Sequence, residues 1–398
     1  MKFNKGAYIV VEGKTADNLF ILRSGTVELQ RDFSVSEGES EHVVIKPGDL
    51  FGVVSALAEH FHIESAVAVT DCEIIAIKAS EYTTIIQKKS DVALKIINGF
   101  SERLRDLDEA LTRITFKKTA EIDKYHLINV ADYYAKQNKY NQAYYAYYRY
   151  LKTCPEGEGV GHAKEAMAKI KPYQKAVHLE TKQDDFVRVY PDNTMIFSEG
   201  EEGSELFIIQ TGSVKITKIV NDNEVLLATL KPGDIFGEMA LLNNEPRSAS
   251  AIAGGDTKMM TVNKRNFVKM VQQEPKMTTR LTTLLAERIW ALYKQLANAM
   301  IEDPTAKMTD ALLIELEKSR VPFGSKISHT FSQGPEDIIK MAGLQNAEGR
   351  PALEKLMSEC KLSIMENRIF AEDVREIKKS ADYYRKMALL KKQREARR

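Results

Sequence analysis

Residues 232–251 read PGDIFGEMALLNNEPRSASA, and this stretch decides the fold and chemistry expected of the second half of the chain. Gly237 can end a strand and let a ligand approach the backbone closely. A short helical turn from Glu238 to Leu242 follows, and its free N–H groups suit an anion. Arg247 offers a fork of donors to a phosphate, whereas the Glu238 carboxylate suits a sugar hydroxyl. The stretch predicts a sugar-phosphate pocket; the alternative is a bare salt bridge between Glu238 and Arg247.

The pattern around this stretch occurs twice, about 185 residues apart. Residues 19–27 (LFILRSGTV) match residues 206–214 (LFIIQTGSV), and the KPGDLFG that starts at Lys46 matches the KPGDIFG that starts at Lys231. Short runs with period-two alternation and glycine turns predict β jelly rolls. Each copy then changes to a helical pattern, near residues 90–114 and 275–300. The chain is therefore expected to contain a duplicated β domain.

The run Phe-Gly-Glu-x-Ala-Leu, followed by Pro-Arg-Ser-Ala, resembles the phosphate-binding cassette of the cyclic nucleotide-binding domain family. Protein kinase A regulatory subunits and the bacterial catabolite activator (Crp/Fnr) regulators carry this cassette. The resemblance covers about residues 186–300. It implies that the second roll binds cyclic AMP or cyclic GMP as a regulatory ligand, without a cofactor, and it leaves open which of the two.

The resemblance also assigns roles to residues of the cassette. Glu238 would hold the ribose 2′-hydroxyl, and Arg247 would pair with the cyclic phosphate. Backbone N–H groups near Ala240 and Leu241, with the Ser248 hydroxyl, would complete the phosphate site. Arg288 and Tyr293, on the helix beyond the roll, are the candidates for contact with the base. The full predicted set is Gly237, Glu238, Met239, Ala240, Leu241, Arg247, Ser248, Ala249, Arg288 and Tyr293.

The first copy lacks these residues. Val53 stands at the glutamate position, and no lysine or arginine occurs from Gly52 to Val67. If Ser65-Ala66 matches Ser248-Ala249, two residues are inserted and Glu64 replaces the arginine, where it would repel a phosphate. The first roll is therefore expected to be a structural or interaction domain, although it could bind a different ligand. His60 and His62 are expected to be surface histidines, not metal ligands.

Residues 120–180 have helical periodicity and many tyrosines. Two helices with small residues at their crossing, and Pro155 after the second, resemble a single tetratricopeptide repeat. One repeat cannot bury its own face, so it must pack on a neighbour or a partner. A helical segment docked on the β domains and a partner-binding repeat both remain open.

Beyond Asp303-Pro304, which should end the long helix, the pattern predicts helix, strand, helix, turn, helix and hairpin. This resembles the winged helix-turn-helix of the catabolite activator family, with Arg350 and Lys355 as candidate DNA contacts. Pro351 should delay the start of the second helix. Residues 303–379 hold 12 basic and 13 acidic side chains. The region therefore has no excess positive charge with which to neutralise DNA phosphates. DNA binding is therefore less clear than the fold.

The sequence thus predicts a mixed α+β chain of two cyclic nucleotide-binding jelly rolls, a tetratricopeptide-like segment and a winged helix. The expected domains are residues 1–115, 116–182, 183–302 and 303–380, with a basic tail at 381–398. Three distant cysteines and the lack of a signal sequence or long apolar run predict a cytoplasmic protein without metal.

No catalytic constellation is visible, so an enzyme is not expected. The favoured hypothesis is a dimeric, cyclic nucleotide-responsive transcription regulator. The alternative is a nucleotide-responsive scaffold that binds protein partners and no DNA. The sequence does not say which operator or partner is bound, or whether the ligand activates or represses.

Overall fold

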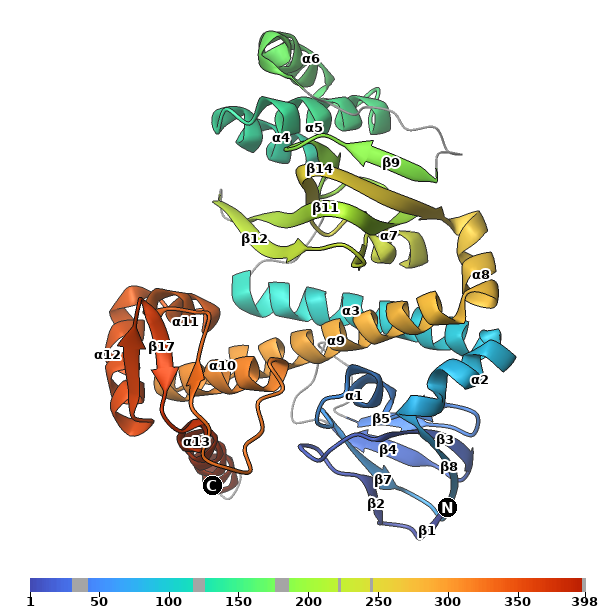
Figure 1. The fold of residues 1–398 in the computed structure, drawn as a ribbon, viewed down its shortest axis with the longest axis vertical. Helices are drawn as coiled ribbons and strands as arrows, with labels where there is room; N and C mark the ends of the chain where they lie inside the picture. The colour runs from blue at the N-terminus through green and yellow to red at the C-terminus, as the bar shows by residue number, and fades with distance from the viewer. Residues whose placement is uncertain (31–41, 117–125, 176–185, 221–222, 244–245, 396–398) are drawn as a thin grey trace. The chain divides into compact units, whose positions relative to one another are not determined.

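The computed structural model describes residues 1–30, 42–116, 126–175, 186–220, 223–243 and 246–395 (Figure 1). The chain forms two compact units. One contains Met1–Glu81, Arg103–Ala120 and Leu285–Arg398, and the other contains Tyr82–Glu102 and Glu121–Leu284. The boundary expected between residues 182 and 183 lies outside the described residues.

The first β sandwich belongs to the first unit and has two four-stranded antiparallel sheets. One sheet has the order β1 (Lys2–Phe3), β8 (Cys72–Lys78), β3 (Asn18–Ser24) and β6 (Leu50–Phe51). The other has the order β2 (Tyr8–Val10), β7 (Ser65–Ala68), β4 (Val27–Gln30) and β5 (His42–Ile45). Alternate side chains such as Leu22, Val27 and Ile74 face inward and form the core. Helix α1 (Val53–Ala58) follows β6, after a left-handed Gly52.

The second β sandwich lies in the second unit and has the same strand order. Its strands are β9 (Val187–Tyr190), β10 (Met195–Phe197), β11 (Glu205–Val220), β12 (Asn223–Leu230), β13 (Ile235–Phe236) and β14 (Ser250–Asn263). The long β11 pairs with β12, β13 and β14, and β14 also pairs with β9 and β10. Strands β11 and β14 thus each take the place of two strands in the first sandwich. The expected duplication of the β domain is visible in this order.

Helices follow each sandwich, close to the predicted bounds. They are α2 (Tyr82–Lys88) and α3 (Ser90–Phe116) after the first, and α8 (Lys264–Gln273) and α9 (Pro275–Ala299) after the second. Helix α7 (Glu238–Asn243) lies inside the cassette, and 3₁₀ turns occur at Ala79–Glu81 and Lys171–Tyr173. Among the described residues, no helix has both the length and the apolar character that a bilayer crossing requires.

The helical segment consists of α4 (His126–Lys136), α5 (Tyr140–Thr153) and α6 (Val160–Ile170). It shares a core with the second sandwich, in which Tyr134 and Tyr150 are buried. Polar contacts fix the same interface: the Tyr145 hydroxyl donates to the Ile196 carbonyl at 3.2 Å, and Gln142 donates to the Asn193 carbonyl at 2.9 Å. The segment is therefore docked on its own sandwich, and its likeness to a tetratricopeptide repeat stays a prediction.

The C-terminal elements surround a single apolar core in the first unit. They are α10 (Pro304–Lys318), α11 (Pro335–Met341), α12 (Asn346–Glu359), α13 (Val374–Glu395) and a sheet of β15 (His329–Thr330), β17 (Arg368–Ala371) and β16 (Leu362–Met365). Asp303 caps α10 by accepting from the Ala306 N–H at 2.8 Å, which confirms the predicted break. Glu366 and Asn367 have positive φ at the predicted hairpin tip.

The expected late start of α12 is wrong. The helix begins at Asn346, and Pro351 lies inside it. The N–H groups of Glu348 and Gly349 both donate to the Gln345 carbonyl and close the first turn before the proline is reached. Pro351 therefore costs one later hydrogen bond but does not set the helix start.

Trp290 of α9 is fully buried within the first unit. Its ring stacks on His60, with centroids 4.0 Å apart, and its Nε1 donates to the Phe61 carbonyl at 3.3 Å. The first sandwich therefore anchors the C-terminal half of α9. Burial, with the nearby Arg320 and Lys294 charges, lowers the pKa of His60 to about 4.

Trp290 is the only tryptophan, so its fluorescence reports on this contact. An imidazolium quenches indole emission, and we expect emission to stay constant through the ordinary histidine pKa of about 6.5 and to fall near pH 4. The unfolded chain takes up this proton first, so the free energy of unfolding should decrease as pH falls through that window. A pH titration of fluorescence measures the step, and His60→Gln should abolish it. A step centred at the ordinary histidine value would contradict the stacked, buried imidazole.

Candidate functional site

The cassette begins with a turn that only glycine fits well. Gly237 follows β13 and has φ +74, in the left-handed region. A Cβ at this position would lie 2.7 Å from Nη1 of Arg247. The missing side chain therefore lets the Arg247 guanidinium lie directly against the turn, although the two residues are ten positions apart in the sequence.

Arg247 is 6% exposed, and its guanidinium is held by main-chain carbonyls. Nη1 donates to the Gly237 carbonyl, and Nη2 donates to the Glu205 carbonyl at 2.8 Å. The group also lies over the Phe197 ring, 4.2 Å from its centroid. Burial lowers the pKa of Arg247, and Glu201 is the first of the acidic neighbours that raise it. A positive charge is thus fixed in a position with little solvent.

Glu238 lies beside this charge. It is the first residue of α7, is 1% exposed, and is among the carboxylates that raise the pKa of Arg247. The structure therefore brings Gly237, Glu238 and Arg247 together. Of the other predicted residues, Ala240, Leu241 and Ala249 are buried, Met239 is partly buried and Ser248 is exposed. Residues 244 and 245 of the cassette lie outside the described residues.

Arg288 and Tyr293 belong to the other compact unit. Their assignment to the base of a ligand therefore stays a prediction. Tyr293 is buried, as is the apolar face of α9 around it, including Leu285, Ile289 and Leu296.

A cavity of about 230 Å³ opens on the Arg247 side of the cassette, within the second unit. Its lining is strongly polar and comes from α5 and the sandwich. The residues are Tyr145, Arg149, Lys152, Arg188, Tyr190, Ile196, Phe197, Glu201, Glu202, Gly203, Ser204, Glu205, Phe207 and Arg247. Glu238 does not line this cavity, whereas Tyr145, Arg149 and Lys152 of α5 do.

Sequence reasoning missed the most buried carboxylate of this cavity, Glu201. It accepts from the Ser198 N–H at 3.0 Å, from the Tyr145 hydroxyl at 3.3 Å and from Arg149 Nη2 at 2.7 Å. Burial raises its pKa, and Arg149 is the first group that opposes the shift. The acidic turn Glu199-Gly200-Glu201-Glu202 was a visible signal, but nothing local linked it to Arg149.

The expectation that Glu64 replaces the arginine of the first cassette is wrong, because His62 holds the main-chain position of Arg247. The His62 N–H donates to the Lys14 carbonyl and the His62 carbonyl accepts from the Gly13 N–H, as those of Arg247 do with Glu201 and Gly200. Val53 begins α1, and Glu64 is 6% exposed. The Nη1 and Nη2 atoms of Arg103, from α3, donate to the Glu64 carboxylate at 3.4 and 2.9 Å. The first cassette thus has an imidazole in place of the arginine, and the charge of its buried Glu64 is neutralised by Arg103 from α3.

The expectation of two surface histidines is wrong for His62, which is 6% exposed, and holds only partly for His60 under Trp290. Burial lowers the pKa of His62, so the neutral ring is favoured. His62 lies at the main-chain position that the buried Arg247 has in the second sandwich, and His60 stacks on Trp290. Within the described part of the chain, no cluster of three or more His, Cys, Asp or Glu residues could hold a metal ion.

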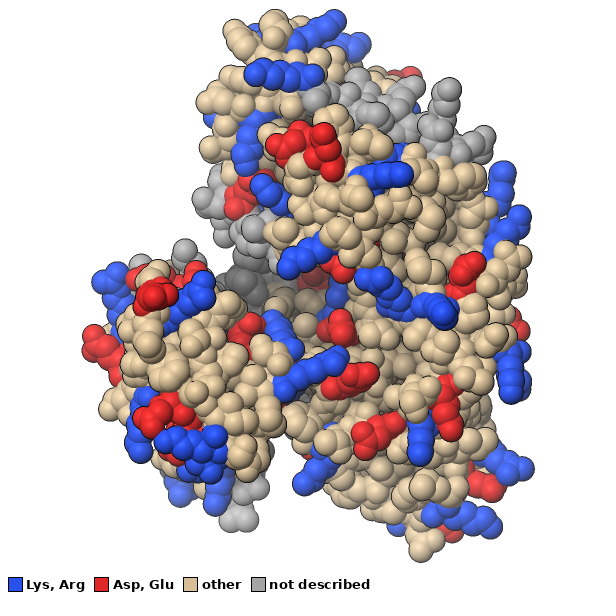
Figure 2. Space-filling model, viewed as in Figure 1, with Lys and Arg blue, Asp and Glu red and all other residues tan. Residues whose placement is uncertain are grey.

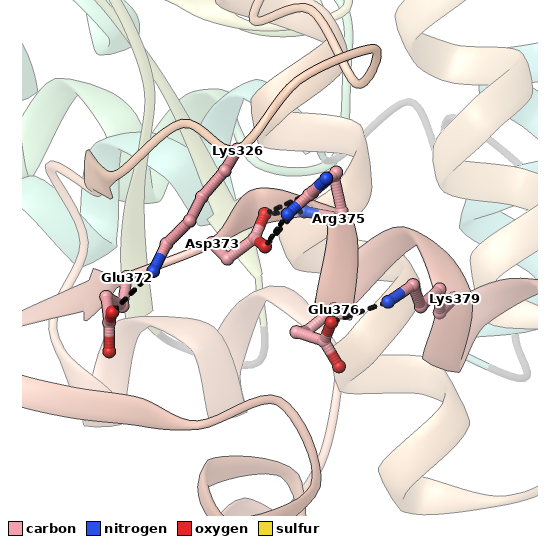
Figure 3. A network of polar contacts seen from close by, with 6 residues as sticks. All are labelled: Lys326, Glu372, Asp373, Arg375, Glu376 and Lys379. Carbon is pink, nitrogen blue, oxygen red and sulfur yellow. Dashed lines mark hydrogen bonds and ion pairs between the residues drawn. The ribbon is translucent and has the colours of Figure 1, made fainter.

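The C-terminal elements present basic side chains that are already paired. Arg350 contacts Glu336 at 3.3 Å, and Lys355 contacts Glu359 at 3.8 Å. Figure 3 shows three further pairs around the start of α13: Lys326–Glu372, Arg375–Asp373 and Lys379–Glu376. On the face drawn in Figure 2, both signs of charge occur together over these elements. The described surface is therefore mixed in charge.

Comparison with known proteins bears on both sandwiches. The cyclic nucleotide-binding domain family matches residues 1–89 and 187–274. The Cyclic AMP receptor protein of Thermus thermophilus is 32% identical over 136 residues, which are 34% of this chain and 63% of that protein. The chain thus spans slightly less than two thirds of this relative.

A second relative and a solved structure are also similar to parts of this chain. The cAMP-dependent protein kinase regulatory subunit of Mycosarcoma maydis is 38% identical over 90 residues, 21% of this chain and 17% of that protein. The crystal structure of the Thermus thermophilus Catabolite Activator Protein covers 50% of this chain and 90% of its own, with 25% identity and a TM-score of 0.29.

The pair in the first sandwich generates a stability prediction. Arg103→Met should leave the Glu64 carboxylate buried without a cation and lower the free energy of unfolding by about 3 kcal/mol. Arg103→Met combined with Glu64→Gln should recover part of that loss. Urea unfolding followed by Trp290 fluorescence measures both, because Trp290 packs on the same sandwich.

The control is Arg23→Met, which breaks the exposed Arg23–Glu73 pair and should change stability by less than about 1 kcal/mol. Equal effects of Arg103→Met and Arg23→Met would show that the Glu64 charge is solvated.

Proposed function

We propose that residues 187–274, which like residues 1–89 match the cyclic nucleotide-binding domain family, bind cyclic AMP or cyclic GMP. The observation that carries this proposal is the burial of Glu238 and Arg247 together at the Gly237 turn. In this role Arg247 pairs with the cyclic phosphate, and Glu238 accepts from the ribose 2′-hydroxyl. The names of two similar proteins include cyclic AMP, which makes it the first ligand to test.

The remaining contacts are proposed on the same basis. Backbone N–H groups of Met239, Ala240 and Leu241 and the Ser248 hydroxyl complete the phosphate site, and Ala249 leaves room beside Arg247. The assignment of Arg288 and Tyr293 to the base stays a prediction. Val53 and His62 stand where the second sandwich has Glu238 and Arg247, so the first sandwich acts as a structural domain that holds the C-terminal half of α9.

We propose that the chain is a regulator and not an enzyme. Its primary output would be transcription control, with residues 303–380 as a winged helix-turn-helix that binds DNA through Arg350 and Lys355. The order of α10, β15, α11, α12 and the β16–β17 hairpin supports this fold. The ligand can shift the protein only by its different affinity for two states, so DNA affinity must change with occupancy.

The paired basic residues of the C-terminal elements favour a second candidate function, in which the chain binds proteins and no DNA. DNA affinity comes largely from cations that neutralise phosphates, and here Arg350 and Lys355 already contact Glu336 and Glu359. A nucleotide-responsive scaffold would instead use the winged helix and the tetratricopeptide-like segment to bind protein partners.

Two further proposals concern the oligomeric state and the cellular location. The homodimer expected from the resemblance stays a prediction. A cytoplasmic location agrees with three free cysteines, two of them buried.

The ligand proposal is tested by calorimetry with cyclic AMP and cyclic GMP. Arg247→Ala should weaken binding by on the order of 2–5 kcal/mol, because the desolvated phosphate loses its charged donor. Glu238→Gln, which keeps the side-chain shape, should weaken it by roughly 1–3 kcal/mol. Arg265→Ala, an exposed arginine on α8, is the control. Absence of binding heat with both nucleotides would reject the sensor.

The output proposal is tested by retention of genomic DNA fragments with and without nucleotide. DNA binding should appear with one ligand state, and Arg350→Ala with Lys355→Ala should reduce the slope of log affinity against log salt by roughly 2. Lys164→Ala with Lys169→Ala, on exposed α6, is the matched control. No retention in either state would reject DNA output, and nucleotide-dependent capture of a protein partner would then support the scaffold.

A further inference from the structure

The cavity between α5 and the second sandwich contains more cations than carboxylates. Four basic residues line it, Arg149, Lys152, Arg188 and Arg247, against three acidic residues, Glu201, Glu202 and Glu205. Within the described residues, the buried Nε atoms of Arg149, Arg188 and Arg247 have no hydrogen-bond acceptor. Buried donors without acceptors are costly, so the lining is suited to one additional negative charge.

The carboxylates of this cavity are not equally available. Glu205 is held by Arg188 through two parallel contacts of 2.7 and 2.8 Å. A bidentate pair of this kind neutralises both charges, although Nε of Arg188 keeps no acceptor. Glu202 is exposed, so Glu201 is the buried carboxylate that balances two cations. Arg149 contacts it at 2.7 Å, and Arg247 lines the same cavity and donates its main-chain N–H to the Glu201 carbonyl at 2.8 Å. Glu201 is also the first neighbour that raises the pKa of Arg247.

Helix α5 fixes the position of Glu201. Tyr145 and Arg149 are four residues apart, so they lie on the same face of α5, and both contact the Glu201 carboxylate. Tyr145 also donates to the Ile196 carbonyl of β10. Burial strongly raises the pKa of the Tyr145 hydroxyl, which therefore remains a donor. A movement of α5 would thus change how the negative charge of Glu201 is divided between Arg149 and Arg247.

We propose that Arg149, acting through Glu201, is a positioning residue for Arg247 and links the helical segment to the nucleotide site. The inference rests on the proposed function and adds a route for regulation. A cyclic phosphate has one negative charge, so at Arg247 it competes with Glu201 for the same guanidinium. Arg149 and Tyr145 hold the displaced carboxylate, which favours the bound state. By linkage, the ligand in turn strengthens the contact between α5 and Glu201.

A double-mutant cycle tests the route, with cyclic AMP and cyclic GMP as the ligands. Arg149→Met should weaken nucleotide binding about tenfold, because the whole Glu201 charge then falls on Arg247. Arg149→Lys, which keeps the charge, should restore most of the affinity. In a Glu201→Gln background, Arg149→Met should have no further effect. Lys164→Met, which removes an exposed charge from α6, is the control.

The outcomes separate this inference from the proposed function. Equal weakening by Arg149→Met in both backgrounds, or no weakening, would overturn the route while leaving the nucleotide site intact. Failure of the unaltered protein to bind either nucleotide would overturn the proposed function and this inference with it. If Arg149→Met does not fold, Tyr145→Phe takes its place, because it removes one donor to Glu201 and keeps the ring. Hydrogen exchange in α5 should slow when nucleotide is added, and an unchanged rate would count against the linkage.

Discussion

A buried guanidinium needs hydrogen-bond acceptors around it, and the second β sandwich is organised around the acceptors that it provides for Arg247. Burial alone would favour loss of the charge, as the lowered pKa indicates. Two carbonyls, at Gly237 and Glu205, take the Nη donors, and the neighbouring acids offset the charge. This arrangement requires a glycine at the turn, since any Cβ would meet the guanidinium. The cassette, β11 and the turn before it are thus joined at one side chain.

The two sandwiches show that this chemistry is separable from the fold. Both have the same strand order and a left-handed glycine before the short helix, at Gly52 and Gly237. The first copy has His62 at the position of Arg247, and its buried Glu64 is neutralised by Arg103. Both sandwiches have alternating apolar residues and turn glycines. Only the second has a buried glutamate and a buried arginine at the cassette, Glu238 and Arg247. The first copy instead contacts Trp290, and this gives it a structural role in its unit.

The helical segment and the C-terminal elements illustrate two ways in which polar groups limit function. In the segment, tyrosine hydroxyls such as Tyr134 and Tyr145 reach into the second sandwich and find partners there, so its position is specified by hydrogen bonds as well as by packing. In the C-terminal elements, pairs such as Arg350–Glu336 leave the surface nearly balanced in charge. Such surface pairs add little stability, but they reduce the positive potential that nucleic acid requires.

The sequence by itself determined the elements whose causes are local. Gly237, Glu238 and Arg247 lie within eleven residues, so turn chemistry and spacing indicated a shared site, and Asp303-Pro304 marked the helix break that the structure has at α10. Local signals failed for the start of α12, because closure of its first turn preceded Pro351. Only the tertiary structure decided that Arg149 meets Glu201, that Arg103 meets Glu64 and that His60 lies under Trp290. These partners are far apart along the chain, and their contact is set by how helices pack on the sandwiches, which periodicity and spacing do not encode.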